Sequence, residues 1–157
     1  MNAQELSRNP QLTQWFVRNL NKEPDGWALE DRSVDAVVCC VSVQYLQQPE
    51  RVLAEVYRVL KPGGVVIITF SNRMFYTKAV AAWRENTDFG RVQLVKTYLG
   101  AVRGFTEAEV VRRVDLGGAP RQQQNPVEAL LRKIFQAAGK DPFFGIVSYR
   151  NFKPGSA

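Results

Sequence analysis

The sequence predicts an α/β fold with a mostly parallel sheet, and three observations support it. Residues 34–43 form an almost unbroken apolar, β-branched run, which is typical of a strand covered on both faces. Residues 49–60 then place apolar side chains at helical spacing, and residues 65–70 form a second apolar run. A strand, a helix and a second strand in this order are typical of a crossover unit in a parallel sheet.

The boundaries of the central helix are marked by capping and breaking residues. Gln48 can cap the helix, with Pro49 at its first position. Pro62 and the pair Gly63–Gly64 end it. The spacing predicts that one set of side chains points inward (Val52, Leu53, Val56, Val59 and Leu60) and another outward (Glu50, Arg51, Glu55 and Arg58).

The N-terminal half has three further predicted elements. We expect a short helix with a loop over residues 6–12, a strand over residues 15–20 and a helix over residues 75–84. A polar connection through residues 24–26 links the strand at 15–20 to the apolar run that follows.

The C-terminal half has two predicted helix starts and one strand. Thr106 and Glu109 are spaced as a capping box, with Phe105 able to pack on Val110. A second start at residues 125–128 opens a helix that ends at Gly139, and residues 117–124 between the two form a loop. Residues 143–149 form the final strand. The apolar side chains of the second helix are Val127, Leu130, Leu131, Ile134 and Phe135.

Composition excludes several kinds of site. The chain of 157 residues has no histidine, which excludes zinc sites with imidazole ligands and Ser-His triads on this chain. Its two cysteines, Cys39 and Cys40, are adjacent in a strand and therefore point to opposite faces, so no metal site or disulfide is expected. No apolar stretch is long enough to predict a membrane span, and residues 1–20 lack the charged and then apolar pattern that would predict a secretory signal. We expect a cytoplasmic location, with a removed upstream transit peptide left open.

The net charge of +6 is unevenly distributed. Residues 91–157 contain eleven basic and five acidic residues, whereas residues 1–90 contain ten of each. A basic face can attract nucleic acid or an anionic membrane. The basic residues are scattered rather than interleaved with aromatic ones, so we favour a solvated surface and do not expect a nucleic-acid partner.

The residues around the central helix also carry a family resemblance. The strand start Asp35-Ala-Val-Val and the string from Glu55 through Arg58-Val-Leu-Lys-Pro-Gly-Gly64 resemble class I S-adenosylmethionine-dependent methyltransferases of the small-molecule kind (type 11). The clear match covers about residues 15–75, and the final strand resembles the terminal antiparallel strand of the same family.

The resemblance implies an incomplete Rossmann-like methyltransferase fold. In that family a first strand, a glycine-rich loop and a first helix precede the matching segment, and this chain has no glycine before Gly26. We therefore expect residues 1–157 to form a single partial methyltransferase-like domain. The strand at residues 34–43 would then have an unpaired edge. That edge would either pair with the strand at 15–20 or support self-association.

The resemblance also implies S-adenosylmethionine as cofactor and a small molecule as methyl acceptor. Ligands of this fold lie beyond the carboxyl ends of the parallel strands. The candidate cofactor-binding residues are Asn19, Leu20, Val41, Ser42 and Tyr45, and Asn19 occupies the position where the family has an acidic residue. No catalytic residue is predicted, since methyl transfer needs mainly positioning of the nucleophile and exclusion of water. Aromatic residues between 72 and 105 are equally compatible with the core and with an acceptor pocket.

Three functions remain open at this point. The first is a methyltransferase domain, inactive or impaired without its glycine loop. The second is a non-catalytic methyltransferase-like subunit that binds another protein through the open sheet edge. The third is another Rossmann-type half, such as a nicotinamide-linked domain, which the Lys61-Pro-Gly-Gly64 turn disfavours.

Overall fold

The computed structural model describes residues 3–112, 125–137 and 143–155. The strands are β1 (Val34–Cys40), β2 (Leu60–Ser71), β3 (Glu109–Arg112) and β4 (Phe143–Tyr149). The helices are α1 (Ala3–Ser7), α2 (Pro49–Val59), α3 (Ala81–Arg84), α4 (Asp88–Gly100) and α5 (Pro126–Ala137), with a short 3₁₀ turn, η1 (Val43–Tyr45). The predicted loop at residues 117–124 and the predicted helix end at Gly139 lie outside the described residues.

The strands form one four-stranded sheet in the order β1-β2-β4-β3. β1 and β2 are parallel, and α2 crosses between them, as the sequence predicted. β4 runs antiparallel to both of its neighbours, so three strands point one way and the final strand points the other. The predicted α/β fold with a terminal antiparallel strand is confirmed.

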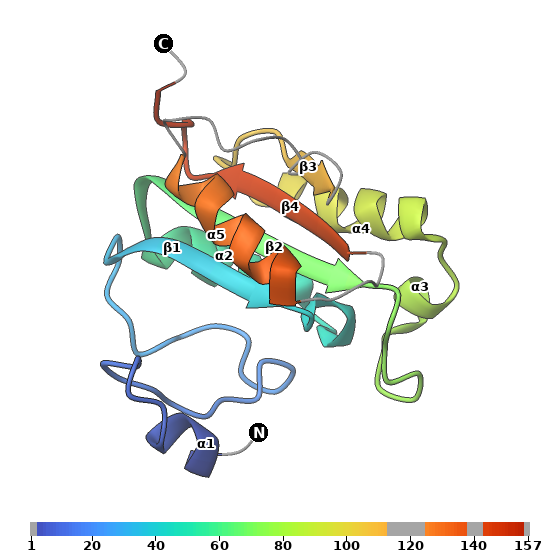
Figure 1. Cartoon of the computed structure of the whole chain (residues 1–157), viewed down its shortest axis with the longest axis horizontal. Helices are drawn as coiled ribbons and strands as arrows, with labels where there is room; N and C mark the ends of the chain where they lie inside the picture. The colour runs from blue at the N-terminus through green and yellow to red at the C-terminus, as the bar shows by residue number, and fades with distance from the viewer. Residues whose placement is uncertain (1–2, 113–124, 138–142, 156–157) are drawn as a thin grey trace.

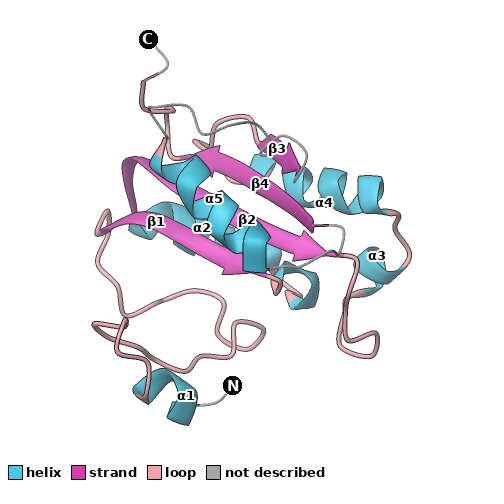
Figure 2. Ribbon diagram, viewed as in Figure 1, coloured by secondary structure: helices cyan, strands magenta, loops and turns pink. Residues whose placement is uncertain are grey.

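Helices cover both faces of this sheet (Figures 1 and 2). On one face, α2 and α4 pack against β2 through Val56, Val95 and Ile68, which are nearly inaccessible to solvent. On the other face, Leu131 and Phe135 of α5 pack against β2 and β4. The main cost of folding is conformational entropy, and these two apolar layers supply the burial that offsets it.

The helix boundaries follow from the residues that the sequence marks. Gln48 is the residue before the first turn of α2 and Pro49 begins the helix, although the Gln48 side chain makes no capping bond. Helix α5 begins at Pro126, and Asn125 Oδ1 accepts a hydrogen bond from the Val127 N–H at 3.0 Å. Both starts are confirmed.

Two predictions about strands are wrong. Residues 15–20 form no strand, because Arg18 folds this segment back on itself by donating to the Glu23 and Asp25 carbonyls. β1 is not covered on both faces. Val38 is 40% exposed, because α5 lies over β2 and β4 instead (Figure 1). β1 is the edge strand of the described sheet, which agrees with the unpaired edge expected for this strand.

Two predictions about helices also need correction. The capping box at Thr106 and Glu109 starts no helix, because Glu109 begins β3 and Thr106 Oγ1 accepts from the Tyr149 N–H at 3.0 Å. Pairing with β4 therefore overrides the local signal. Of the helix predicted at residues 75–84, only α3 is helical, and α4, which has Thr87 as its N-cap, was not predicted.

The structure predicts different outcomes for alanine at two neighbouring glycines. Gly104 has φ +102°, and a Cβ there would collide with the Tyr57 hydroxyl, whereas a Cβ on Gly100 meets nothing within 4 Å. We expect Gly104→Ala to lower the free energy of unfolding by about 1–3 kcal/mol, and Gly100→Ala to leave it equal or raise it by up to about 1 kcal/mol. Urea unfolding of both variants measures this, and equal effects would contradict the strained geometry at Gly104.

Candidate cofactor site at the carboxyl ends of the parallel strands

The carboxyl ends of β1 and β2 lie side by side. Cys40 pairs with Thr69, and the Val41 N–H donates to the Thr69 carbonyl at 2.8 Å. The loops that follow the two strands also meet, because the Val80 N–H donates to the Gln44 carbonyl at 3.0 Å. This edge is where open α/β sheets bind ligands.

The backbone turns sharply at Val41. Its φ of +48° is left-handed, a conformation that costs energy for a β-branched residue. The fully buried Gln44 holds the turn by donating from Nε2 to the Val41 carbonyl at 3.1 Å. Among the described residues, neither Gln44 Oε1 nor the buried Thr69 Oγ1 has a hydrogen-bond partner. Strained backbone and unpaired buried polar atoms are unfavourable, and both are found more often at functional sites than elsewhere in a protein.

Ser42 and Tyr45 follow on the same turn. Ser42 Oγ lies 3.2 Å from Cys39 Sγ, and burial raises the pKa of the Cys39 thiol. The Tyr45 hydroxyl accepts a hydrogen bond from the Phe75 N–H at 3.0 Å, which leaves its own proton for another acceptor. Val41, Ser42 and Tyr45 therefore lie together along the predicted edge.

Asn19 and Leu20 lie elsewhere, since the strand that was to carry them does not form. Asn19 is exposed, and its Oδ1 accepts from the Asn21 N–H at 3.0 Å. Its carbonyl also accepts from the N–H groups of residues 22 and 23. The Asn19 side chain is thus engaged in its own turn rather than presented at the end of a strand.

Asn21 connects this turn to the segment that follows the carboxyl end of β1. This role of Asn21 was not predicted from the sequence. Its Nδ2 donates to the Tyr45 carbonyl and its Oδ1 accepts from the Gln47 N–H, both at 2.9 Å. The Gln48 side chain adds a hydrogen bond to the Asn21 carbonyl at 3.3 Å. Asparagine in a turn was the only available signal, because the partners are more than twenty residues away.

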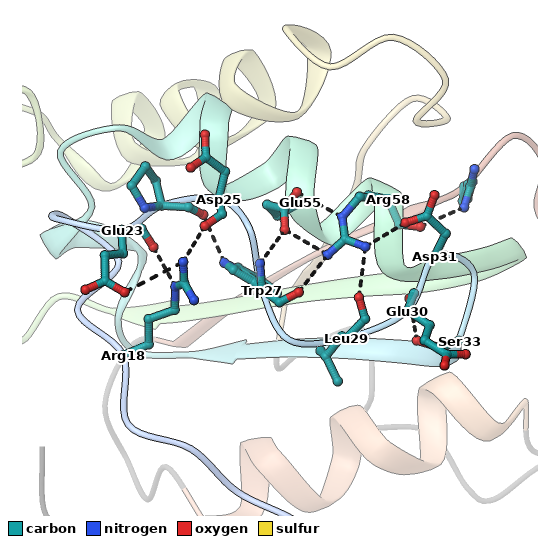
Figure 3. Close-up of polar contacts among 12 residues, drawn as sticks. Arg18, Glu23, Asp25, Trp27, Leu29, Glu30, Asp31, Ser33, Glu55 and Arg58 are labelled. Carbon is teal, nitrogen blue, oxygen red and sulfur yellow. Dashed lines mark hydrogen bonds and ion pairs between the residues drawn. The ribbon is translucent and has the colours of Figure 1, made fainter.

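A network centred on Arg58 holds the loop that leads into β1 (Figure 3). Arg58 makes two hydrogen bonds of 2.9 Å to the Glu55 carboxylate, one from Nε and one from Nη2. It also donates to Asp31 Oδ1 at 2.6 Å and to the carbonyls of Leu29 and Trp27 at 2.8 and 3.1 Å. All five N–H donors of this guanidinium are therefore used.

The same network corrects the prediction that Glu55 faces outward. Glu55 is buried, since its carboxylate also accepts from the Trp27 N–H at 2.9 Å. Hydrogen bonding to Arg58 is the main cause that lowers the pKa of Glu55, and the hydrogen bonds to Glu55 and Asp31 raise the pKa of Arg58. A charged pair tied to backbone on both sides fixes residues 27–31 against α2.

Replacing Glu55 by Gln gives a pH-dependent prediction. The lowered pKa means that ionised Glu55 stabilises the fold above its unfolded pKa of about 4.3, and that this stability is lost as pH falls through the folded pKa. We expect Glu55→Gln to cost about 1–2 kcal/mol at neutral pH, allowing for solvent screening at Arg58. The difference from the unaltered chain should shrink below about pH 4.

The control is Glu50→Gln, an exposed position on the same helix. Chemical denaturation at several pH values measures both variants. A Glu55→Gln deficit that does not change with pH would contradict an ionic role for Glu55.

The described residues contain neither a metal cluster nor a helix that could span a membrane. No group of three or more Cys, Asp or Glu side chains in residues 3–112, 125–137 and 143–155 is placed to hold a metal ion. Within the same ranges, each helix is too short or too polar to cross a bilayer.

Comparison with known proteins gives a partial family match. Residues 1–68 match the family model described as a methyltransferase domain. A thiol S-methyltransferase of Rattus norvegicus is 53% identical over 38 residues, which are 24% of this chain and 16% of the relative. The Homo sapiens thiol S-methyltransferase gives the same identity and coverage. The chain thus matches about a sixth of the length of these relatives.

A solved structure gives the same answer for the fold. The crystal structure of an S-adenosylmethionine dependent methyltransferase from Mesorhizobium loti has a TM-score of 0.51 and 11% sequence identity. The alignment covers 95% of this chain and 77% of that chain. The family match and this shared fold confirm the resemblance to S-adenosylmethionine-dependent methyltransferases.

Proposed function

We propose that this chain, whose first 68 residues match a methyltransferase domain, takes part in methyl transfer from S-adenosylmethionine to a small-molecule acceptor. The observation that carries the proposal is the turn at residues 41–45, where the ends of two parallel strands, a left-handed Val41 and the Tyr45 hydroxyl come together. In this proposal residues 1–157 act as one partial methyltransferase-like domain.

The groups at this edge fit one wall of a cofactor site. Ser42 and Tyr45 offer hydroxyl groups, and the exposed Val41 offers apolar surface. Asn19 and Leu20 belong to the turn that Asn21 ties to Tyr45, and we assign them to the adenine end of the cofactor. This set suits a nucleoside with an amino acid tail, which needs hydrogen bonds along one side and apolar contact along the other.

When bound, the cofactor supplies a methyl group on a positively charged sulfur. The task of this chain is then to hold that methyl beside the acceptor and to exclude water. The backbone at Val41 and Ser42 would orient the methionine end, and the loop at residues 72–80 would shield it, since the Phe75 N–H reaches Tyr45. A thiol is the first acceptor class to test, because two relatives with matching segments are thiol S-methyltransferases.

Calorimetric titration with S-adenosylhomocysteine tests the cofactor proposal. We expect micromolar binding by the unaltered chain. Tyr45→Phe should weaken binding about fivefold through loss of one hydrogen bond. Tyr57→Phe is the matched control, because its hydroxyl bonds Asn151 at 2.6 Å at the opposite end of the sheet. Absence of binding by the folded, unaltered chain would contradict the proposal.

A second proposed role is association through the edge of β1, as expected for a non-catalytic binding subunit or a self-associating chain. β1 ends the described sheet, and Ala36, Val38 and Cys40 are exposed along it. An edge strand without charge over residues 36–40 offers backbone groups and apolar side chains to another strand.

Sedimentation velocity tests association through this edge. We expect the unaltered chain to sediment as a dimer or larger species, and Val38→Lys to shift it toward monomer, because an added charge blocks edge pairing. Ala54→Lys, at an exposed position on α2, should leave the distribution unchanged. A clean monomer for the unaltered chain would overturn association through β1.

A further inference from the structure

The loop at residues 72–80 presents two aromatic rings to solvent. Phe75 is 69% exposed and Tyr76 is 68% exposed. Figure 1 shows this loop protruding from the body of the molecule after β2, next to α3. Two adjacent rings exposed together on one loop form an apolar surface that could contact a partner.

The loop is anchored at both ends, so the exposure of the rings follows from the fold. The Phe75 N–H donates to the Tyr45 hydroxyl and the Ala79 N–H donates to the Phe75 carbonyl, both at 3.0 Å. Ala79 is 3% exposed, and the Val80 N–H is bonded to the Gln44 carbonyl. The chain therefore turns back into the core directly after the two rings.

Each exposed ring has a cation beside it. Lys78 Nζ lies 5.5 Å from the centroid of the Phe75 ring, and the Arg84 guanidinium lies 5.3 Å from that of Tyr76. Arg84 Nη1 also donates to the Ala79 carbonyl at 3.1 Å, which fixes the cation over the loop. Residues 72–91 contain four basic and two acidic residues, and one of those acids, Asp88, is paired with Arg91 at 3.0 Å.

We propose that the loop at residues 72–80 docks the protein on an anionic lipid bilayer. The rings of Phe75 and Tyr76 enter the boundary between headgroups and acyl chains, where aromatic side chains are favoured. Lys78 and Arg84, held at the same loop, then meet lipid phosphates. A loop that carries two exposed rings with a cation beside each combines apolar contact with positive charge, which is complementary to an anionic bilayer surface.

Docking in this way would also orient the candidate cofactor site at the carboxyl ends of β1 and β2. Because the Phe75 backbone is bonded to Tyr45, the loop and the turn at residues 41–45 would approach the bilayer together. The inference is independent of whether cofactor binds at that turn, since it uses only the loop and its cations.

Co-sedimentation with vesicles tests the inference. The purified chain is mixed with vesicles of phosphatidylcholine and phosphatidylserine, and separately with vesicles of phosphatidylcholine alone. We expect binding mainly to the anionic vesicles. The double variant Phe75→Ala/Tyr76→Ala should reduce partitioning at least about tenfold, and Lys78→Gln about fivefold.

Phe89→Ala is the matched control, because Phe89 is also 69% exposed but lies on α4 outside the loop. It should bind like the unaltered chain, and circular dichroism checks that every variant is folded. Three results would overturn the inference: no binding of the unaltered chain, equal binding to neutral vesicles, or equal losses in Phe89→Ala and the double variant.

Discussion

The guanidinium of Arg58 is the interaction on which the entry into the sheet depends. One side chain on α2 binds the Glu55 carboxylate, Asp31 and two backbone carbonyls of the loop before β1. Removing it would leave the buried Glu55 charge and both carbonyls short of donors at once, and uncompensated buried charge is among the costliest defects in a protein. The loop also starts β1, because the Arg32 N–H donates to the Arg58 carbonyl at 3.0 Å and the Ser33 N–H to the Val59 carbonyl at 2.8 Å.

The residues that carry the family resemblance are architectural in this structure. Arg58 fixes the preceding loop, and Lys61 Nζ pairs with Asp35 at 2.8 Å across the start of the two parallel strands. Gly63 has φ +76°, and a Cβ on Gly64 would lie 2.8 Å from the Lys61 carbonyl, so neither position admits another side chain without displacement. The residues from Arg58 to Gly64 therefore determine how α2 joins β2. The candidate cofactor site lies at the opposite, carboxyl end of the strands.

Elements that depend on local interactions could be predicted from the sequence, whereas those that depend on contacts between distant residues could not. α2, β4 and the start of α5 were predicted closely, because their apolar spacing and end signals are local. β2 was found at residues 65–70 but begins earlier, at Leu60, so Pro62 and Gly63 lie within the strand rather than ending the helix. The prediction of a strand at residues 15–20 was wrong, because a strand needs a pairing partner and no local sequence pattern indicates one. Thr106 and Glu109 were misread for the same reason, because β4 recruits that segment. At the candidate site, Val41, Ser42 and Tyr45 follow from the strand end, whereas Asn21 and Gln44 act through contacts that only the folded chain brings together.

The register of β2 with β4 has a consequence for how the chain folds. Val65 pairs with Tyr149, so the centre of the sheet is closed by two segments separated by most of the chain's length. The unit β1-α2-β2 is synthesised before β4, so one side of β2 stays without its strand partner until β4 is made. Ordering the chain between β2 and β4 costs conformational entropy, and the strand pairing that offsets this cost forms only afterwards. Contacts between residues so far apart in sequence therefore slow folding. Newly made chains would therefore pass through a stage in which residues 65–70 are an open apolar strand, the stage at which a chaperone would be most useful.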